Sequence, residues 1–330
     1  MRTGTYLKAI MRNKHLFRGK VNIERRKDDL EALPQVVLDV GCGTGVLSIF
    51  AAKAGAAKVA DRLVFSHKEP CQVIGVDMSS VARHAAEVIK KNGYEEHVSI
   101  VRGRVEEVKI GVEKVDIIVS EWMGYCLLYE SMLPSVLFAR DKYLAEDGLL
   151  LPSSCSLYIG GMSDIAWHNL KFGFWDNVEG YKMHAMKALA ITEPTVDLVN
   201  PVSMMTEPFL VKKLNLHTCT KDDLEFNTHF NLKATRNGNL TALVAFFNVS
   251  FDDGHKGIVL STSPWAPPTH WKQTIFHLKN NVRVSQGQLI GGSFDVKSNS
   301  RNERDLDLTV RVQREEEEGV LTECSLFKLR

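Results

Sequence analysis

The chain of 330 residues carries a formal net charge of +1, with 44% hydrophobic and 25% charged residues. Because a single hydrophobic core stops growing at about 250–300 residues, this length favours two domains with separate cores. The near-neutral charge excludes the broad basic surface that nucleic-acid binding usually needs, and no apolar run approaches the ~20 residues of a membrane span, so we expect no direct contact with nucleic acid or membrane.

Strand-like and helix-like stretches alternate through the first half of the chain. Five apolar runs stand out as strands, at residues 36–40, 73–77, 98–102, 115–120 and 148–151. This alternation predicts a doubly wound, Rossmann-like α/β domain with a parallel sheet. Pro152 ends this half, which places the first domain at residues 21–152.

The second half, residues 153–330, has the period of two that is typical of antiparallel strands. Candidate strands of a β-barrel cover residues 210–216, 225–234, 240–251, 274–278 and 306–312. Asn237-Gly238 predicts a tight hairpin between two of them. A segment at about 163–201, rich in Trp, Phe and Met, interrupts the pattern and reads as helices. It is either a helical excursion packed on its own barrel or an arm that contacts a partner.

A glycine-rich turn follows the first predicted strand. Gly41, Gly43 and Gly45 are spaced as GxGxG, a looser pattern than the GxGxxG of dinucleotide-binding proteins, and no P-loop lysine is present. Asp77 ends the next strand, where an acidic residue of this fold holds both ribose hydroxyls. The combination fits S-adenosylmethionine as well as NAD.

Two carboxylates frame an aromatic, glycine-bearing turn after the strand at 115–119. The stretch runs from Ser120-Glu121-Trp122 to Glu130-Ser131-Met132. Ligands of open parallel sheets bind outside the carboxyl ends of the strands, where both this turn and the glycine turn begin. We therefore expect a nucleotide-like cofactor to face a pair of carboxylates.

Together with the downstream Thr269-His270-Trp271, these motifs resemble the type I protein arginine methyltransferases, and the resemblance runs over nearly the whole chain. It implies S-adenosylmethionine as cofactor and methyl transfer to arginines of proteins, giving mono- and asymmetric dimethylarginine. It also implies a homodimer, with the segment at 163–201 as a dimerisation arm, and Arg/Gly-rich substrates such as RNA-binding proteins and histone tails.

The resemblance also implies a role for individual residues. Glu121 and Glu130 would bind the substrate guanidinium, and His270 would accept or relay the released proton. Tyr125 and Trp271 would line the arginine channel. The implied cofactor contacts are Gly41 at the methionine part, Asp77 at the ribose, Glu106 at the adenine amino group, Arg2 at the carboxylate, and Asp39, Gly43 and Met132 around them.

Taken without the resemblance, several of these residues have structural interpretations. Asp39 reads as a strand-end turn residue, Glu106 as a surface carboxylate, and Met132 as a packing residue of a helix. A lone histidine such as His270 is more often structural than catalytic, and Trp271 by itself would be assigned to the core.

The six cysteines form no CxxC pair and no metal-ligand spacing. This pattern predicts reduced thiols and no metal site. Residues 1–20 are basic and polar and lack the apolar core of a signal peptide. We therefore expect a protein of the cytoplasm and nucleus.

The chain departs from the family pattern in two ways. Relatives carry an N-terminal helix with a Tyr-Phe-x-x-Tyr motif that covers the cofactor and would precede Met1, so residues 1–20 read as a helix remnant and we expect weak cofactor binding and poor methyl transfer. Residues 21–35 and 59–72 are extra segments, each starting with Val and ending with Gln. The two hypotheses for them are unspliced introns and surface loops at the amino edge of the sheet.

Three functions compete. The leading hypothesis is a type I protein arginine N-methyltransferase. The alternative from another class is a catalytically silent family member that acts as a dimerising scaffold or activator. A small-molecule methyltransferase is the third, disfavoured by the barrel and arm that extend the substrate surface.

Overall fold

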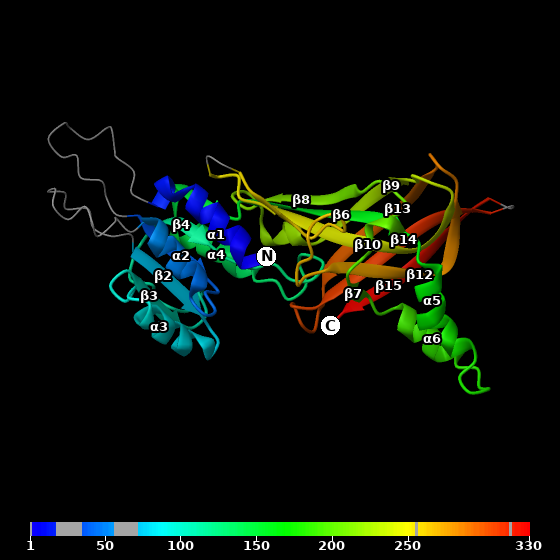
Figure 1. The fold of residues 1–330 in the computed structure, drawn as a ribbon, viewed down its shortest axis with the longest axis horizontal. Coiled ribbons are helices and arrows are strands. Elements are labelled where there is room, and N and C mark those ends of the chain that lie inside the picture. The colour runs from blue at the N-terminus through cyan, green and yellow to red at the C-terminus, as the bar shows by residue number, and fades with distance from the viewer. Residues whose placement is uncertain (1, 18–34, 56–71, 255–256, 317–318) are drawn as a thin grey trace.

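The computed structural model describes residues 2–17, 35–55, 72–254, 257–316 and 319–330. Of the extra segments at 21–35 and 59–72, only Gln35 and Gln72 are among these residues. The two hypotheses about the segments therefore lie outside the described residues. Figure 1 shows an α/β domain on the left, a larger β domain on the right, and a pair of helices projecting from the far end of the β domain. Within the described ranges, no helix is long and apolar enough to cross a membrane.

The α/β domain is built on a five-stranded parallel sheet in the order β3-β2-β1-β4-β5. Its central strands are buried on both faces, which explains their continuous apolar runs. The sequence-predicted doubly wound fold is confirmed. The strands are β1 (Val36–Val40), β2 (Gln72–Asp77), β3 (Val98–Arg102), β4 (Val115–Val119) and β5 (Leu144–Leu151), with helices α2 (Val46–Gly55), α3 (Val81–Lys91) and α4 (Leu133–Tyr143).

The β domain consists of two antiparallel sheets that share one core. One has the order β7-β12-β10-β6-β8, with β11 beside β10, and the other has the order β15-β14-β13-β9. Phe276 of β12 contacts both Phe294 and Phe327 of the second sheet, with ring centroids 5.6 and 5.1 Å apart. The strands are β6 (Ser154–Met162), β7 (Thr195–Asp197), β8 (Phe209–Asn215), β9 (Phe226–Lys233), β10 (Gly238–Ser250), β11 (Val259–Ser261), β12 (Gln273–Val284), β13 (Leu289–Ser298), β14 (Leu306–Glu316) and β15 (Gly319–Leu329).

The predicted hairpin at Asn237-Gly238 is wrong. The flanking strands β9 and β10 belong to different sheets, because β9 pairs with β13 whereas β10 pairs with β6, β11 and β12. The Asn237 side chain instead accepts a hydrogen bond from the backbone N–H of Gln286, at 2.7 Å. The dipeptide marks a connection between sheets, since turn residues report local geometry and not the identity of the paired strands.

The segment at 163–201 is helical for most of its length. It contains α5 (Ile165–Phe172), the 3-10 turn η3 (Gly173–Asp176) and α6 (His184–Ile191), and it returns to the barrel through β7, which pairs with β12. Phe172 is fully buried against the barrel residue His277, with ring centroids 4.9 Å apart. The segment also leaves large apolar side chains exposed, namely Leu170, Phe174, Tyr181, Met183, Met186 and Leu189.

His277 makes the junction between arm and barrel sensitive to acid. It is 2% exposed and stacks on Trp167 at 4.7 Å, and burial, with smaller effects of the Lys171 and His168 charges, lowers its pKa to about 3. Its stabilising contribution is therefore complete above pH ~6.5 and falls by about 1.4 kcal/mol per pH unit between there and pH ~3, because only the unfolded chain takes up the proton.

Urea unfolding of His277→Phe should show a shallower loss of stability from neutral pH to pH ~5 than wild type. The exposed His229→Gln should keep the wild-type slope, and an equal slope in His277→Phe would contradict this account.

The N-terminal helix α1 (Arg2–Arg12) connects the two domains. Its side chains Tyr6, Ala9 and Ile10 are buried. Tyr6 donates a hydrogen bond from its hydroxyl to the Ser120 carbonyl oxygen at 2.9 Å and packs edge-on against Phe251 of the barrel side. This packing fixes the start of the helix, and with it Arg2, beside the end of β4.

Candidate active site

The double-glutamate loop, residues 120–132, begins where β4 ends and is closed by its own backbone. The N–H of Met132 donates to Trp122 at 3.0 Å, and the N–H of Gly124 donates to Leu127 at 3.0 Å. A Cβ at Gly124 would collide with the Tyr129 carbonyl, so this position requires glycine for the loop to close. Two contacts from the barrel side complete the support, because Glu130 donates its N–H to the Arg304 carbonyl at 2.9 Å and Trp271 donates from its indole to the Met123 carbonyl at 3.0 Å.

Glu121 lies at the base of this loop and already holds a guanidinium. Its Oε2 accepts a hydrogen bond from Arg2 Nη1 at 2.9 Å. Burial raises the pKa of Glu121 to about 7, and the Arg2 charge opposes that rise. A carboxylate that is partly withdrawn from water in this way binds a cation more strongly than an exposed one.

His270 and Trp271 approach the same point from the barrel. His270 Nε2 lies 3.3 Å from Arg2 Nη1, and the Arg2 guanidinium carbon lies 6.0 Å from the centre of the Trp271 ring. Burial, followed by the Arg2 charge, lowers the pKa of His270. Among the described residues no carboxylate lies within ion-pair distance of His270.

The glycine turn follows the end of β1, beside the double-glutamate loop. Gly41 and Gly43 have φ values of +73° and +52°, and a Cβ at Gly41 would collide with the end of the Met132 side chain. Gly43 donates its N–H to Asp77 Oδ2 at 2.9 Å, and no heavy atom lies within 4 Å of the place where its Cβ would be. The end of β2, through Asp77, and the double-glutamate loop, through Met132, therefore both contact the glycine turn.

Asp39 is buried below this turn. Its Oδ2 accepts a hydrogen bond from Ser48 at 2.6 Å, whereas its Oδ1 has no hydrogen-bond partner among the residues that the structure describes. Burial raises the pKa of Asp39 to about 7, and the hydrogen bond from Ser48 opposes the rise. The residues present fit a cofactor with positive charge and several hydrogen-bond donors, because a buried carboxylate oxygen, the open side of Gly43 and the Asp77 carboxylate border the same turn.

The structure brings several of the predicted site residues into contact with one another. Arg2, Glu121, His270 and Trp271 form one cluster, and Gly41 with Met132 and Gly43 with Asp77 form the adjoining one. Glu106 accepts a hydrogen bond from Ser135 at 2.6 Å and pairs with Arg104 at 3.6 Å. Glu130 is exposed with a φ of +51°, and Tyr125 is 37% exposed and stacks on Tyr129. The predicted contacts of Glu130 and Tyr125 with the substrate, and of Glu106 with the cofactor, stay predictions.

Sequence reasoning missed two supporting residues. Tyr6 positions α1 through its bond to Ser120, and Ser48 holds Asp39. The amphipathic spacing of Tyr6, Ala9 and Ile10 was a signal that the helix buries one face.

Comparison with known proteins identifies the relatives of this arrangement. Residues 34–189 match a family described as a methyltransferase domain, and residues 153–317 match one described as the arginine methyltransferase oligomerization subdomain. The chain is 40% identical over 330 residues to protein arginine N-methyltransferase 1 of Chlamydomonas reinhardtii, covering 100% of this chain and 87% of that protein. This chain belongs to the protein arginine methyltransferase family.

Other members of the arginine methyltransferase family agree with this assignment. Protein arginine N-methyltransferase 1 of Schizosaccharomyces pombe is 41% identical over 310 residues, covering 94% of this chain and 83% of that protein. Among solved structures, the Trypanosoma brucei PRMT1 enzyme-prozyme heterotetrameric complex with AdoHcy matches with a TM-score of 0.87 and 38% identity, over 100% of this chain and 95% of that one. The predicted two-domain methyltransferase architecture is thereby confirmed.

Proposed function

We propose that this protein arginine methyltransferase is a type I enzyme, which forms mono- and then asymmetric dimethylarginine on Arg/Gly-rich proteins of the cytoplasm and nucleus and acts as a homodimer. S-adenosylmethionine is the methyl donor. One observation carries the proposal on substrate class, namely the Arg2 guanidinium held by Glu121 at 2.9 Å beside His270. A site that binds a guanidinium of its own chain has the negative charge and the hydrogen-bond acceptor that the guanidinium of a substrate needs.

Two carboxylates suit this reaction because the arginine side chain is a poor nucleophile. Its guanidinium is a delocalised cation with a pKa above about 12, which an ordinary base does not deprotonate. Glu121 and Glu130 would bind it through paired N–H···O bonds and draw positive charge toward the nitrogens they contact. The remaining nitrogen then gains electron density for attack.

The carboxylates also reduce a charge repulsion. The substrate guanidinium and the donor sulfonium are both cations, and two unit charges about 4 Å apart interact by ~4 kcal/mol at an effective dielectric constant near 20. Bound S-adenosylmethionine supplies an electrophilic methyl group. Asp77 and Glu106 would bind the ribose and the adenine of this cofactor. Arg2 uses Nη1 for Glu121, and the N–H groups of its other guanidinium nitrogens would bind the cofactor carboxylate.

His270 is suited to accept the proton that the methylated guanidinium releases. Burial and the Arg2 charge lower its pKa, which favours the neutral imidazole, and a neutral imidazole has one nitrogen that can accept a proton. Trp271, buried between Met123 and Phe247, would form a fixed wall beside the arginine.

Product analysis tests the proposal. Incubation of the protein with S-adenosylmethionine and an Arg/Gly-rich peptide, followed by acid hydrolysis and chromatography, should give monomethylarginine first and asymmetric dimethylarginine later. Symmetric dimethylarginine would contradict the type I assignment. Absence of any methylarginine, with S-adenosylmethionine binding retained in calorimetry, would favour the scaffold alternative.

A further inference from the structure

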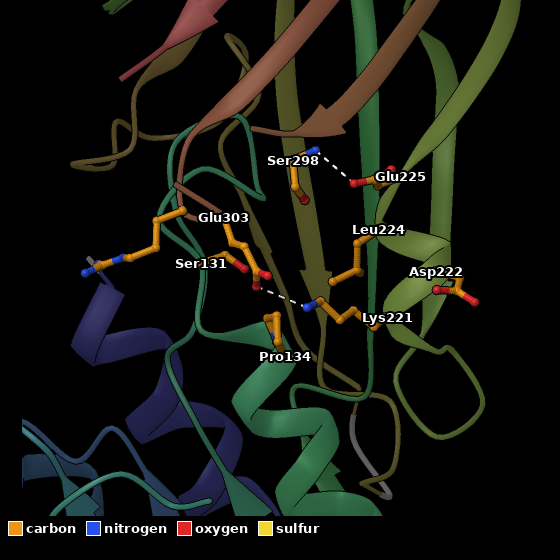
Figure 2. A pocket seen from close by; sticks show the side chains of 9 residues that line it. Ser131, Pro134, Lys221, Asp222, Leu224, Glu225, Ser298 and Glu303 are labelled. Atoms are coloured by element: carbon orange, nitrogen blue, oxygen red, sulfur yellow. Dashed lines mark hydrogen bonds and ion pairs between the residues drawn. The ribbon is translucent and has the colours of Figure 1, made fainter. Parts of the chain in front are cut away.

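A cavity lies next to the double-glutamate loop on the barrel side. Its volume is about 610 Å³, and it lies between the start of α4, the 3-10 turn η5 (Lys221–Leu224) and the connection from β13 to β14. Figure 2 shows Lys221 and Glu303 pointing toward one another across this cavity. Three chain segments that are distant in sequence therefore form its walls.

Two residues that line the cavity adjoin Glu130 of the double-glutamate loop. Ser131, one of its lining residues, directly follows Glu130, and consecutive Cα atoms are about 3.8 Å apart. Arg304, another lining residue, accepts the Glu130 N–H at 2.9 Å. A peptide that presents an arginine to Glu130 thus has this cavity beside it.

The lining has an apolar part and a charged rim. Pro134 and Leu224 supply the apolar part, and Glu303 pairs with Lys221 at 3.1 Å on the rim. Both side chains of this pair are largely exposed, Lys221 by 64% and Glu303 by 78%. An exposed ion pair of this kind contributes only about 0–1 kcal/mol, so a better partner for Glu303 can replace Lys221 at little cost.

We propose that this cavity binds a second arginine of the same substrate polypeptide, whose guanidinium displaces Lys221 from Glu303. The proposal rests on the proposed function. The alkyl part of an arginine would cover Pro134 and Leu224, and its planar head would form two parallel bonds with a carboxylate where an ammonium acts as a point charge. Glu225 and Asp222 add two negative charges to the same lining, against one positive charge from Arg304, so the lining stays negative once Lys221 is displaced.

The proposal requires a substrate in which two arginines lie close together in the sequence. An extended chain covers about 3.3–3.6 Å per residue, so arginines three residues apart are about 10 Å apart. Lys221 acts in this arrangement as a competitor that the substrate has to displace. The cavity would therefore favour substrates with repeated arginines over those with a single one.

Two substitutions with opposite expected effects test the proposal. Fluorescence anisotropy would measure the affinity of labelled glycine-rich peptides with one arginine or with two arginines three residues apart, in the presence of S-adenosylhomocysteine so that no transfer occurs. The quantity of interest is the advantage of the two-arginine peptide. It is expressed as the dissociation constant of the one-arginine peptide divided by that of the two-arginine peptide. Glu303→Gln should lower this ratio about three- to tenfold, and Lys221→Gln should raise it by roughly threefold.

A matched exposed pair on the same barrel provides the control. Lys233 and Glu207 pair at 3.6 Å, and Lys233 lies opposite Leu289, at the end of β13 away from Ser298. Lys233→Gln and Glu207→Gln make the same changes in charge and should leave the ratio as in wild type.

An unchanged ratio in both cavity variants would overturn the proposal, and so would a decrease in Lys221→Gln that matches that in Glu303→Gln. A wild-type protein that binds both peptides equally would also overturn it. Methyl transfer to the one-arginine peptide, measured in parallel, tests the proposed function separately.

Discussion

Glu121→Gln and Glu130→Gln are each expected to reduce methyl transfer by about 100- to 1000-fold while leaving S-adenosylmethionine affinity within a few-fold of wild type. The amide keeps the shape of the side chain and loses its charge. It can no longer draw positive charge through the guanidinium or offset the repulsion from the sulfonium. Initial rates on an Arg/Gly-rich peptide, with calorimetry of cofactor binding, would measure both quantities.

The pH dependence of the rate identifies Glu121 more specifically. Because burial raises its pKa to about 7, the ionised form that binds the guanidinium increases as the pH rises through that value. Wild-type kcat/KM should therefore rise between pH ~6 and ~8, and this rise should be lost in Glu121→Gln. Glu96→Gln, at an exposed position between α3 and β3, should behave as wild type. Wild-type turnover in either catalytic variant would refute the assignment of the carboxylates.

The second large effect concerns the arm. Leu170→Asp combined with Leu189→Asp is expected to convert a homodimer into monomers and to weaken cofactor binding. These side chains are 77% and 56% exposed, and such apolar side chains grouped on one pair of helices exceed what a monomer normally leaves in contact with water. Size-exclusion chromatography with light scattering would give the mass.

Substitution is a cleaner test than deletion of residues 163–201, because deletion would also remove β7, which pairs with β12. Leu289→Asp, at a position 61% exposed on β13, is the control and should remain dimeric. Circular dichroism should show the same fold in all variants. A wild-type protein that is already monomeric would refute the arm as a dimer contact.

The parallel sheet could be predicted from sequence, whereas the long barrel strands β6, β13 and β15 were not predicted. Strands buried on both faces have continuous apolar runs, so β1 and β4 were evident. Strands β6 and β13 each contain adjacent glycines, which weaken the strand signal. The structure explains these glycines, since a Cβ at Gly160 would lie 2.8 Å from Met204 Cε and one at Gly292 would collide with Arg311.

The chemistry of the site was more predictable than its supports. Glu121, His270 and the glycine turn belong to short motifs that carry the resemblance to the arginine methyltransferases, and their roles were predicted from that resemblance. The contact between Arg2 and Glu121 joins residues far apart in the chain, and nothing in the pattern of α1 specifies its partner. Tyr6 was unpredictable for the same reason, because amphipathic spacing indicates a buried face without identifying what covers it.

The support of the double-glutamate loop has a consequence for modularity. The loop belongs by sequence to the cofactor domain, yet Tyr6, Trp271 and Arg304 hold it from the N-terminal helix and from the barrel. Neither domain contains all the groups that position the two carboxylates. The geometry of the loop is therefore a property of the assembled chain, and exchanging one domain between relatives would transfer the motif without the contacts that fix it.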